Sequence, residues 1–139
     1  MGQKTQHYVQ GQWQSGTGEG IPVFDSITGE HFTSTTVRGL DVASILQYGR
    51  DNGETLRKMT FQQRGNMLKS LAMYLTKRKQ SFYDISYRTG ATKRDSWIDI
   101  EGGFGNLFAN ASLRKLFPNQ SYHVEGDPID LSRGGRFMA

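Results

Sequence analysis

The chain has 139 residues and no cysteine, and its 17 basic and 13 acidic side chains give a net charge of +4. This length fits one domain or part of one. Without cysteine, the sequence holds no disulfide, no cysteine-ligated zinc or iron–sulfur site and no thiol nucleophile. The hydrophobic content of 35 % is low for a self-sufficient globular domain, so we expect the chain to depend on packing partners.

Residues 1–39 are predicted to form strands and turns. Apolar and polar positions alternate on both sides of Gly11, which predicts a short ribbon. The apolar run 21–24 predicts a strand, and Pro22 places it at an edge or at its own start. The threonine-rich stretch 31–37 predicts a further strand.

Residues 40–117 are predicted to be helical, because apolar residues recur there at intervals of three and four. Asp41 is a good N-cap, and Thr60 with Gln63 fits a capping box. We expect about four helices: Asp41 to Leu56, one from Thr60 onward, a short one that ends before Gly90, and Thr92 to Leu116. The tail, 118–139, is predicted to be irregular or β.

Two clusters of charged residues could form a site. The carboxylates of Asp95, Asp99 and Glu101 could bind a metal or act in acid–base catalysis. No histidine lies at helical spacing from them, so a solvated helix face is the favoured interpretation. A basic cluster could meet a phosphate, although acidic residues interrupt it and a solvated surface is again favoured. Its members are Lys77, Arg78, Lys79, Arg88, Lys93 and Arg94.

Two groups of glycines could bring the backbone close to a ligand. Gly16, Gly18 and Gly20 lack the spacing and the following helix of a dinucleotide fingerprint, so a hairpin or mobile loop is favoured. The segment 102–105 has three glycines inside a helical pattern, where each costs about 1 kcal/mol relative to alanine. A ligand could approach the backbone closely there, but close packing between helices or a local kink is favoured.

The order of these pieces resembles the start of an aldehyde dehydrogenase. The matching motifs are Gly11-Gln12-Trp13, Thr28-Gly29-Glu30, Met59-Thr60, Gln63-Arg64 and Thr89-Gly90. Gln63 stands where the family has glutamate, and Asp25-Ser26-Ile27 replaces its asparagine–proline–alanine. The block 89–108 is similar to the branch found in phenylacetic acid degradation. In that branch the dehydrogenase is fused to a C-terminal MaoC-type hydratase that opens the oxepin-CoA ring.

The resemblance covers nearly all of residues 7–137 and implies an α+β fragment of the α/β aldehyde dehydrogenase fold. Residues 1–139 would be a truncated N-terminal part of the dehydrogenase domain, and the tail would lead to the missing Rossmann strand. Family members use a cysteine nucleophile and pass hydride to NADP or NAD. Their catalytic and cofactor-binding residues map to no position here. We therefore expect a segment that is inactive alone and binds no cofactor or metal itself.

The resemblance also suggests one site and a set of partners. By position, the apolar face of the last helix could contribute to the wall of the substrate tunnel, with ordinary core packing as the alternative. This face consists of Phe104, Leu107, Phe108 and Ala111. The expected partners are the remainder of the dehydrogenase domain and further copies in a homo-oligomer, without nucleic acid or membrane. A cytoplasmic location is expected, because no targeting signal or long apolar run is present.

A second hypothesis belongs to a different class of protein. A free-standing basic helical adaptor would bind an anionic partner through a continuous positive face. The interrupted basic cluster and the N-terminal ribbon argue against it.

Overall fold

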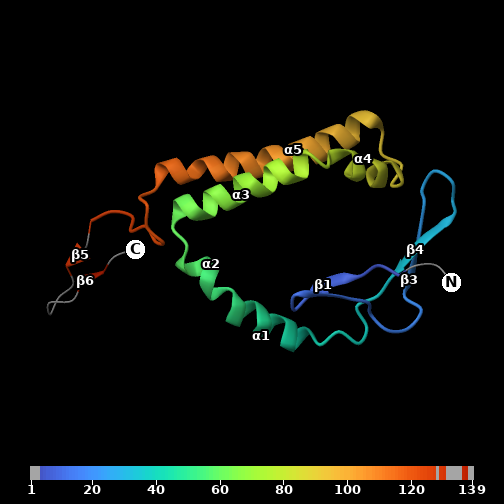
Figure 1. The fold of residues 1–139 in the computed structure, drawn as a ribbon, viewed down its shortest axis with the longest axis horizontal. Helices are drawn as coiled ribbons and strands as arrows, with labels where there is room; N and C mark the ends of the chain where they lie inside the picture. Colours follow the sequence, from blue (N-terminus) through green and yellow to red (C-terminus); the bar gives the residue numbers. More distant parts are fainter. Residues whose placement is uncertain (1–3, 128, 131–135, 138–139) are drawn as a thin grey trace.

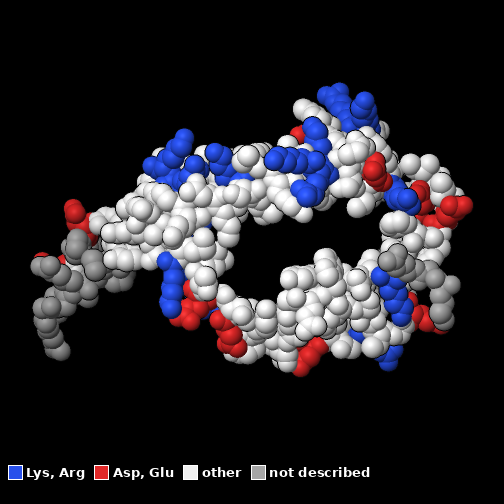
Figure 2. Space-filling view, in the orientation of Figure 1, with Lys and Arg blue, Asp and Glu red and all other residues white. Residues whose placement is uncertain are grey.

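The computed structural model describes residues 4–127, 129–130 and 136–137. For residues 136 and 137 it describes the backbone alone. Three helices lie along one side of the molecule, and the N-terminal ribbons with α1 lie along the other (Figure 1). The space-filling view shows an opening between these two sides (Figure 2). The elements therefore form a ring rather than two layers closed on each other.

The first ribbon is confirmed where the alternating pattern predicted it. Strand β1 (His7–Val9) pairs antiparallel with β2 (Gln12–Gln14). Gln10 and Gly11, which connect them, have φ values of 52° and 78°. A two-residue connection with positive φ at both positions matches the right-handed twist of paired strands.

The second ribbon pairs β3 (Ile21–Phe24) with β4 (His31–Thr35), again antiparallel. Its turn is held by Asp25, whose carboxylate accepts hydrogen bonds from the backbone N–H groups of Ile27 and Thr28. These bonds lower the pKa of Asp25. All four residues of β3 are exposed. The ribbon therefore lacks a covering layer within the described chain. An isolated two-stranded ribbon is only marginally stable in water, so we expect this one to need such a layer.

The first predicted helix is divided in two. Asp41 caps α1 (Val42–Asn52) as expected, with its carboxylate accepting from the Ser44 N–H. The helix then ends at Gly53, and α2 (Glu54–Lys58) follows directly. Asparagine and glycine at 52 and 53 are both poor helix formers, which favours a break at this point. No residue of α1 or α2 is buried.

The remaining helices form the long side of the ring. They are α3 (Phe61–Thr76), α4 (Lys79–Tyr87) and α5 (Lys93–Ser112), followed by a 3₁₀ turn at Leu113–Leu116. The capping box at Thr60 and Gln63 is confirmed. Gly90, with φ +83°, lies between α4 and α5. Two short strands of the tail, β5 (Ile129–Asp130) and β6 (Arg136–Phe137), form a third ribbon.

The core lies between α3 and α5 and is small. Among the described residues, the buried hydrophobic side chains are Ala72, Phe104 and Ala111. The chain exposes 10908 Å². A compact monomer of 15.7 kDa would expose about 7,300 Å² by the size scaling of folded proteins. The molecule therefore exposes roughly half as much surface again as a closed domain of its mass.

Candidate functional site

The face predicted for the tunnel wall lies on α5 in two different environments. Phe104 and Ala111 are buried. Ala111 lies next to Gly65 of α3, and Phe104 makes an edge-to-face contact with Phe82 of α4, with 5.7 Å between the ring centroids. Leu107 is half-buried and Phe108 is exposed to 38 %. Phe104 and Ala111 thus have a packing role within the chain. A tunnel role for this face stays a prediction.

Helices α3 and α5 approach each other closely at Gly65. A Cβ atom at this position would lie 2.9 Å from the carbonyl oxygen of Ala111 and 2.5 Å from Cδ of Arg114. Only a residue without a side chain allows the helices to approach this closely. Gly65 therefore permits the close approach of α3 to α5, the helix that carries the candidate face.

The three glycines of α5 behave in the opposite way. A Cβ at Gly102, Gly103 or Gly105 would meet nothing within 4 Å. The helix runs unbroken through them from 93 to 112. In the part of the chain that the structure describes, no close helix partner accounts for these glycines. These three positions, called the glycine strip below, leave bare backbone over a broad exposed arc of α5.

The acidic residues of α5 do not form one site. Asp95 caps its own helix, since its carboxylate accepts from the N–H and the hydroxyl of Thr92. Asp99 is exposed, and Glu101 is half-buried. No cluster of three histidine or acidic side chains suited to a metal occurs in the described ranges.

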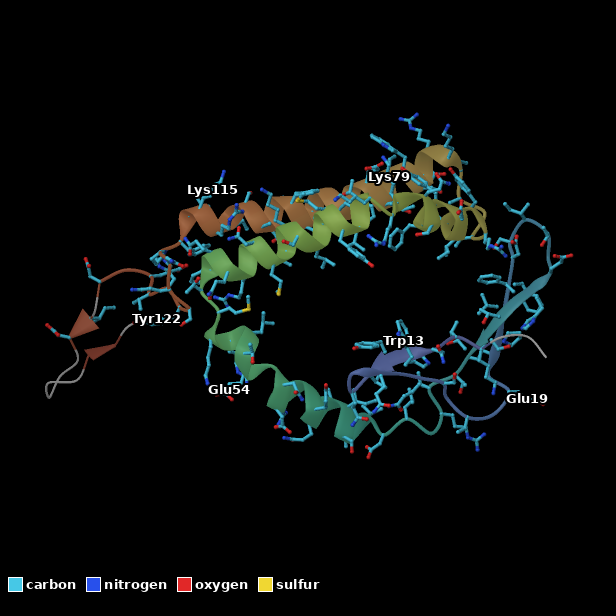
Figure 3. The ribbon with its side chains drawn as sticks, viewed as in Figure 1. Trp13, Glu19, Glu54, Lys79, Lys115 and Tyr122 are labelled. Atoms are coloured by element: carbon cyan, nitrogen blue, oxygen red, sulfur yellow. The ribbon has the colours of Figure 1, made fainter. Side chains whose placement is uncertain are left out.

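Glu101 belongs instead to a network that the sequence analysis missed. Its Oε1 lies 2.6 Å from Nζ of Lys79 and accepts a 3.2 Å hydrogen bond from the hydroxyl of Tyr83. The network joins the start of α4 to the middle of α5, where Lys79 is labelled in Figure 3. Because Lys79 and Glu101 are 22 residues apart, no local spacing signalled the pair.

The network shifts the acid–base behaviour of all three groups. The hydrogen bond from Lys79 lowers the pKa of Glu101, and the same bond raises the pKa of Lys79. Desolvation by burial, followed by the hydrogen bond to Glu101, raises the pKa of Tyr83. At neutral pH the site is a lysinium–carboxylate pair with a protonated phenol, a stable tie between helices rather than a proton donor–acceptor pair.

Part of the basic cluster is engaged within the chain. Besides Lys79, Arg88 lies 3.7 Å from the Asp25 carboxylate and stacks over Phe32, and Arg78 stacks over the Tyr74 ring. Other lysines and arginines follow the outer edge of α3 to α5 (Figure 2). These contacts take up charges that a continuous basic face would need.

The glycine loop between β2 and β3 is tied to the end of β4. The Thr17 N–H donates to the Arg38 carbonyl, and Gly16 is buried against the backbone of Thr36. A strand, not a helix, follows the loop. This arrangement agrees with a turn and not with a phosphate-binding loop. No helix in the described ranges has the length and apolar character needed to cross a bilayer.

The comparisons with known proteins give one informative similarity. No family model matches the chain. Over 137 residues the chain is 32 % identical to a 3,4-dehydroadipyl-CoA semialdehyde dehydrogenase of Aromatoleum evansii. The match covers 97 % of this chain and 27 % of that protein, so the chain spans about a quarter of the relative's length. The similarity supports an aldehyde dehydrogenase-like origin.

Proposed function

We propose that this chain serves as the N-terminal framework segment of an NAD(P)-dependent semialdehyde dehydrogenase and is inactive alone. The observation that carries the proposal is the 32 % identity, which extends over 97 % of the chain and matches 27 % of a semialdehyde dehydrogenase. A similarity spread over a whole chain, yet covering about a quarter of its relative, fits a structural part of a larger enzyme. The phenylacetate-type branch, NADP as cofactor, the aldehyde dehydrogenase fold and a homo-oligomer belong to the same proposal.

The apolar surface of the second ribbon supports a packing role. Ile21 is 72 % exposed and Phe24 is 55 % exposed on β3. A strand whose apolar residues are exposed on both faces gains little from burial in the chain itself. In the proposed enzyme, further parts of the protein cover this ribbon and supply the missing burial.

The first ribbon presents a similar feature. Trp13, labelled on β2 at the edge of the central opening (Figure 3), is 65 % exposed and packs edge-on against Tyr8. Large exposed aromatic groups gathered at one opening mark a surface that a partner covers. The opening is where we propose that the rest of the dehydrogenase domain packs.

The bare strip on α5 supports the same proposal. Each glycine in a helix interior costs about 1 kcal/mol relative to alanine, and the described chain offers no compensating contact at Gly102, Gly103 or Gly105. Close approach of another backbone would repay that cost. In the proposed enzyme, α5 presents this bare backbone to a neighbouring element, and the adjoining Leu107 and Phe108 contribute to the wall of the substrate tunnel.

In the proposed enzyme, the chemistry is divided between this segment and the rest of the protein. This sequence has no cysteine, so the nucleophile that attacks the aldehyde belongs to another part of the enzyme. That other part also binds the nicotinamide cofactor, which accepts the hydride. The present segment positions helices and excludes water around the reacting groups.

A chimera tests this proposal. The matching segment of the Aromatoleum evansii relative is replaced by this chain, and the chimera is assayed for reduction of NADP⁺ or NAD⁺ with an aldehyde substrate. We expect measurable activity from the chimera and none from the 139-residue chain alone. The control is the relative with the same segment deleted, which should be inactive.

A binding measurement covers the case in which the chimera misfolds. The deleted relative is immobilised, and the 139-residue chain is passed over it. Saturable binding is expected, because the exposed ribbons and α5 would find their packing partners. Turnover by the 139-residue chain alone, or the absence of both chimera activity and binding, would contradict the proposal.

A further inference from the structure

A cavity opens between α4 and the first turns of α5. Tyr83, which belongs to the network with Lys79 and Glu101, lines it. Its volume is about 560 Å³, within the range of pockets that hold small organic ligands. The lining residues are Gln80, Tyr83, Tyr87, Lys93, Arg94 and Trp97. Three aromatic rings and two cations therefore meet in one small space.

The aromatic side of the cavity is ordered. Tyr83 and Tyr87, one helical turn apart on α4, lie with ring centroids 6.1 Å apart and planes inclined by 29°. The hydrogen bond from the Tyr83 hydroxyl to Glu101 fixes the orientation of that ring. Trp97, on α5, is 58 % exposed. Aromatic side chains with free faces are platforms for stacking flat rings such as nucleobases.

The cationic side of the cavity is uncompensated. Lys93 and Arg94 lie in the first turn of α5. No carboxylate of the described residues lies within 4.0 Å of either side chain, whereas Lys79 is paired. Cations in the first turn of a helix interact unfavourably with the positive end of the helix dipole. A bound anion would offset this interaction.

The acidic groups near the cavity are otherwise occupied. Asp84 accepts a hydrogen bond from the side-chain amide of Gln80, and Asp95 caps its helix at Thr92. Glu101 is neutralised by Lys79. The side chains that line the cavity are aromatic, amide or cationic, and none of them is a carboxylate.

We propose that this cavity binds a mononucleotide, with the base stacked on the tyrosines and Trp97 and the phosphate held by Lys93 and Arg94. The inference stands on the cavity itself and does not depend on the proposed dehydrogenase function. It departs from the expectation that the segment binds no cofactor. A ligand with an aromatic ring but no phosphate would leave the two cations unpaired. A ligand with a phosphate but no ring would make no stacking contact with the aromatic side chains.

Trp97 provides the readout. The chain has two tryptophans, so Trp13→Phe leaves Trp97 as the single reporter and keeps an aromatic ring against Tyr8. In this background AMP is titrated while Trp97 fluorescence is recorded, and adenosine and inorganic phosphate are titrated in parallel. We expect saturable quenching by AMP, with about tenfold weaker binding of adenosine because it lacks charge-assisted bonds to phosphate.

Two double variants separate the cavity from general electrostatics. Lys93→Gln with Arg94→Gln should weaken AMP binding about tenfold or more and leave adenosine binding unchanged. Arg50→Gln with Lys77→Gln removes the same two charges outside the cavity and should change AMP affinity less than about twofold. Tyr87→Leu should weaken AMP and adenosine alike. Far-ultraviolet circular dichroism confirms that each variant keeps its helices.

Three results would overturn the proposal. The first is no saturable change in Trp97 emission at millimolar AMP. The second is inorganic phosphate binding as tightly as AMP, which would show that the aromatic walls take no part. The third is an equal loss of AMP binding in the Arg50/Lys77 and Lys93/Arg94 variants, which would reduce the effect to net charge.

Discussion

Gly65 of α3 lies so close to Ala111 of α5 that a Cβ at position 65 would come within 2.9 Å of the Ala111 carbonyl oxygen. That oxygen belongs to the backbone of a helix and moves only with the whole element. The Arg114 side chain on the same side adds contacts at 2.5 and 2.7 Å. The crossing of the two longest helices therefore depends on the absence of one methyl group.

Gly65→Ala should destabilise the chain although alanine is the better helix former. The propensity gain is about 1 kcal/mol, while overpacking a tight contact costs about 1–3 kcal/mol. We expect a net loss of about 1 kcal/mol or more in the free energy of unfolding, measured by urea denaturation. A stability equal to or above that of the parent chain would show that the helices separate without cost.

Gly103→Ala is the matched substitution with the opposite expected sign. It lies on the other long helix, and its Cβ would meet nothing within 4 Å. The gain in helix propensity is then unopposed, so we expect a stabilisation of about 0.5–1 kcal/mol in the same urea experiment. A loss of stability would indicate a contact at Gly103 within this chain.

In the chimera, the proposed function predicts that Gly103→Ala is destabilising, whereas it stabilises the isolated chain. If a neighbouring element packs on the glycine strip, the alanine methyl group at 103 should lower chimera activity or thermal stability. The same substitution at Gly49, which also faces open space but lies on α1, is the control and should be tolerated. Equal tolerance at both positions would remove the strip from the proposed contact surface.

Local signals explain which parts of the fold could be predicted. Asp41 and Thr60 cap their helices by accepting hydrogen bonds from the N–H groups of residues three positions later. Both partners of each bond therefore lie within four consecutive residues of the sequence. The Gln10-Gly11 connection is equally local. The break at Gly53 was missed because apolar spacing continues through it to Leu56, although the local helix propensity falls.

Long-range pairings explain what could not be predicted. Glu101 was grouped with Asp95 and Asp99 because they are neighbours in sequence, yet its partners, Lys79 and Tyr83, come from α4. The cavity between α4 and α5 depends on the turn at Gly90, which brings the two helices together. The exposure of α1 and β3 has no sequence signature, because their apolar patterns are those of buried elements.

The end of α5 is held by a stacked aromatic pair that yields another prediction. Phe61 and Phe117 lie with ring centroids 4.5 Å apart and planes inclined by 17°. Phe117→Ala should cost about 2–3 kcal/mol, from lost burial together with the aromatic contact. Leu116→Ala is the control next to it. Leu116 is 75 % exposed, so its truncation should change stability by less than about 0.5 kcal/mol. Similar losses from both variants would contradict a specific role for the pair.

The Lys79–Glu101 pair predicts a pH dependence of stability. Lys79 lowers the pKa of Glu101 below its ordinary value of 4.5. The stability from the carboxylate is therefore complete above pH 4.5 and is lost as the pH falls through the lower folded-state pKa. The pKa of Lys79 is raised above 10.5, and that of Tyr83 above 10.0. Their contribution is complete below those values and is lost as the pH rises through the folded-state pKa values.

Glu101→Gln tests this dependence, because glutamine keeps the size of the side chain and an oxygen for Tyr83. The parent chain should melt at a higher temperature than the variant near neutral pH, and the difference should shrink as the pH is lowered below 4.5. Glu54→Gln is the control, since it removes one carboxylate from the exposed pair with Lys58. Exposed pairs contribute little, so its melting temperature should follow the parent at every pH. A difference between the parent and Glu101→Gln that stays constant down to about pH 2 would assign the effect to packing rather than to ionisation.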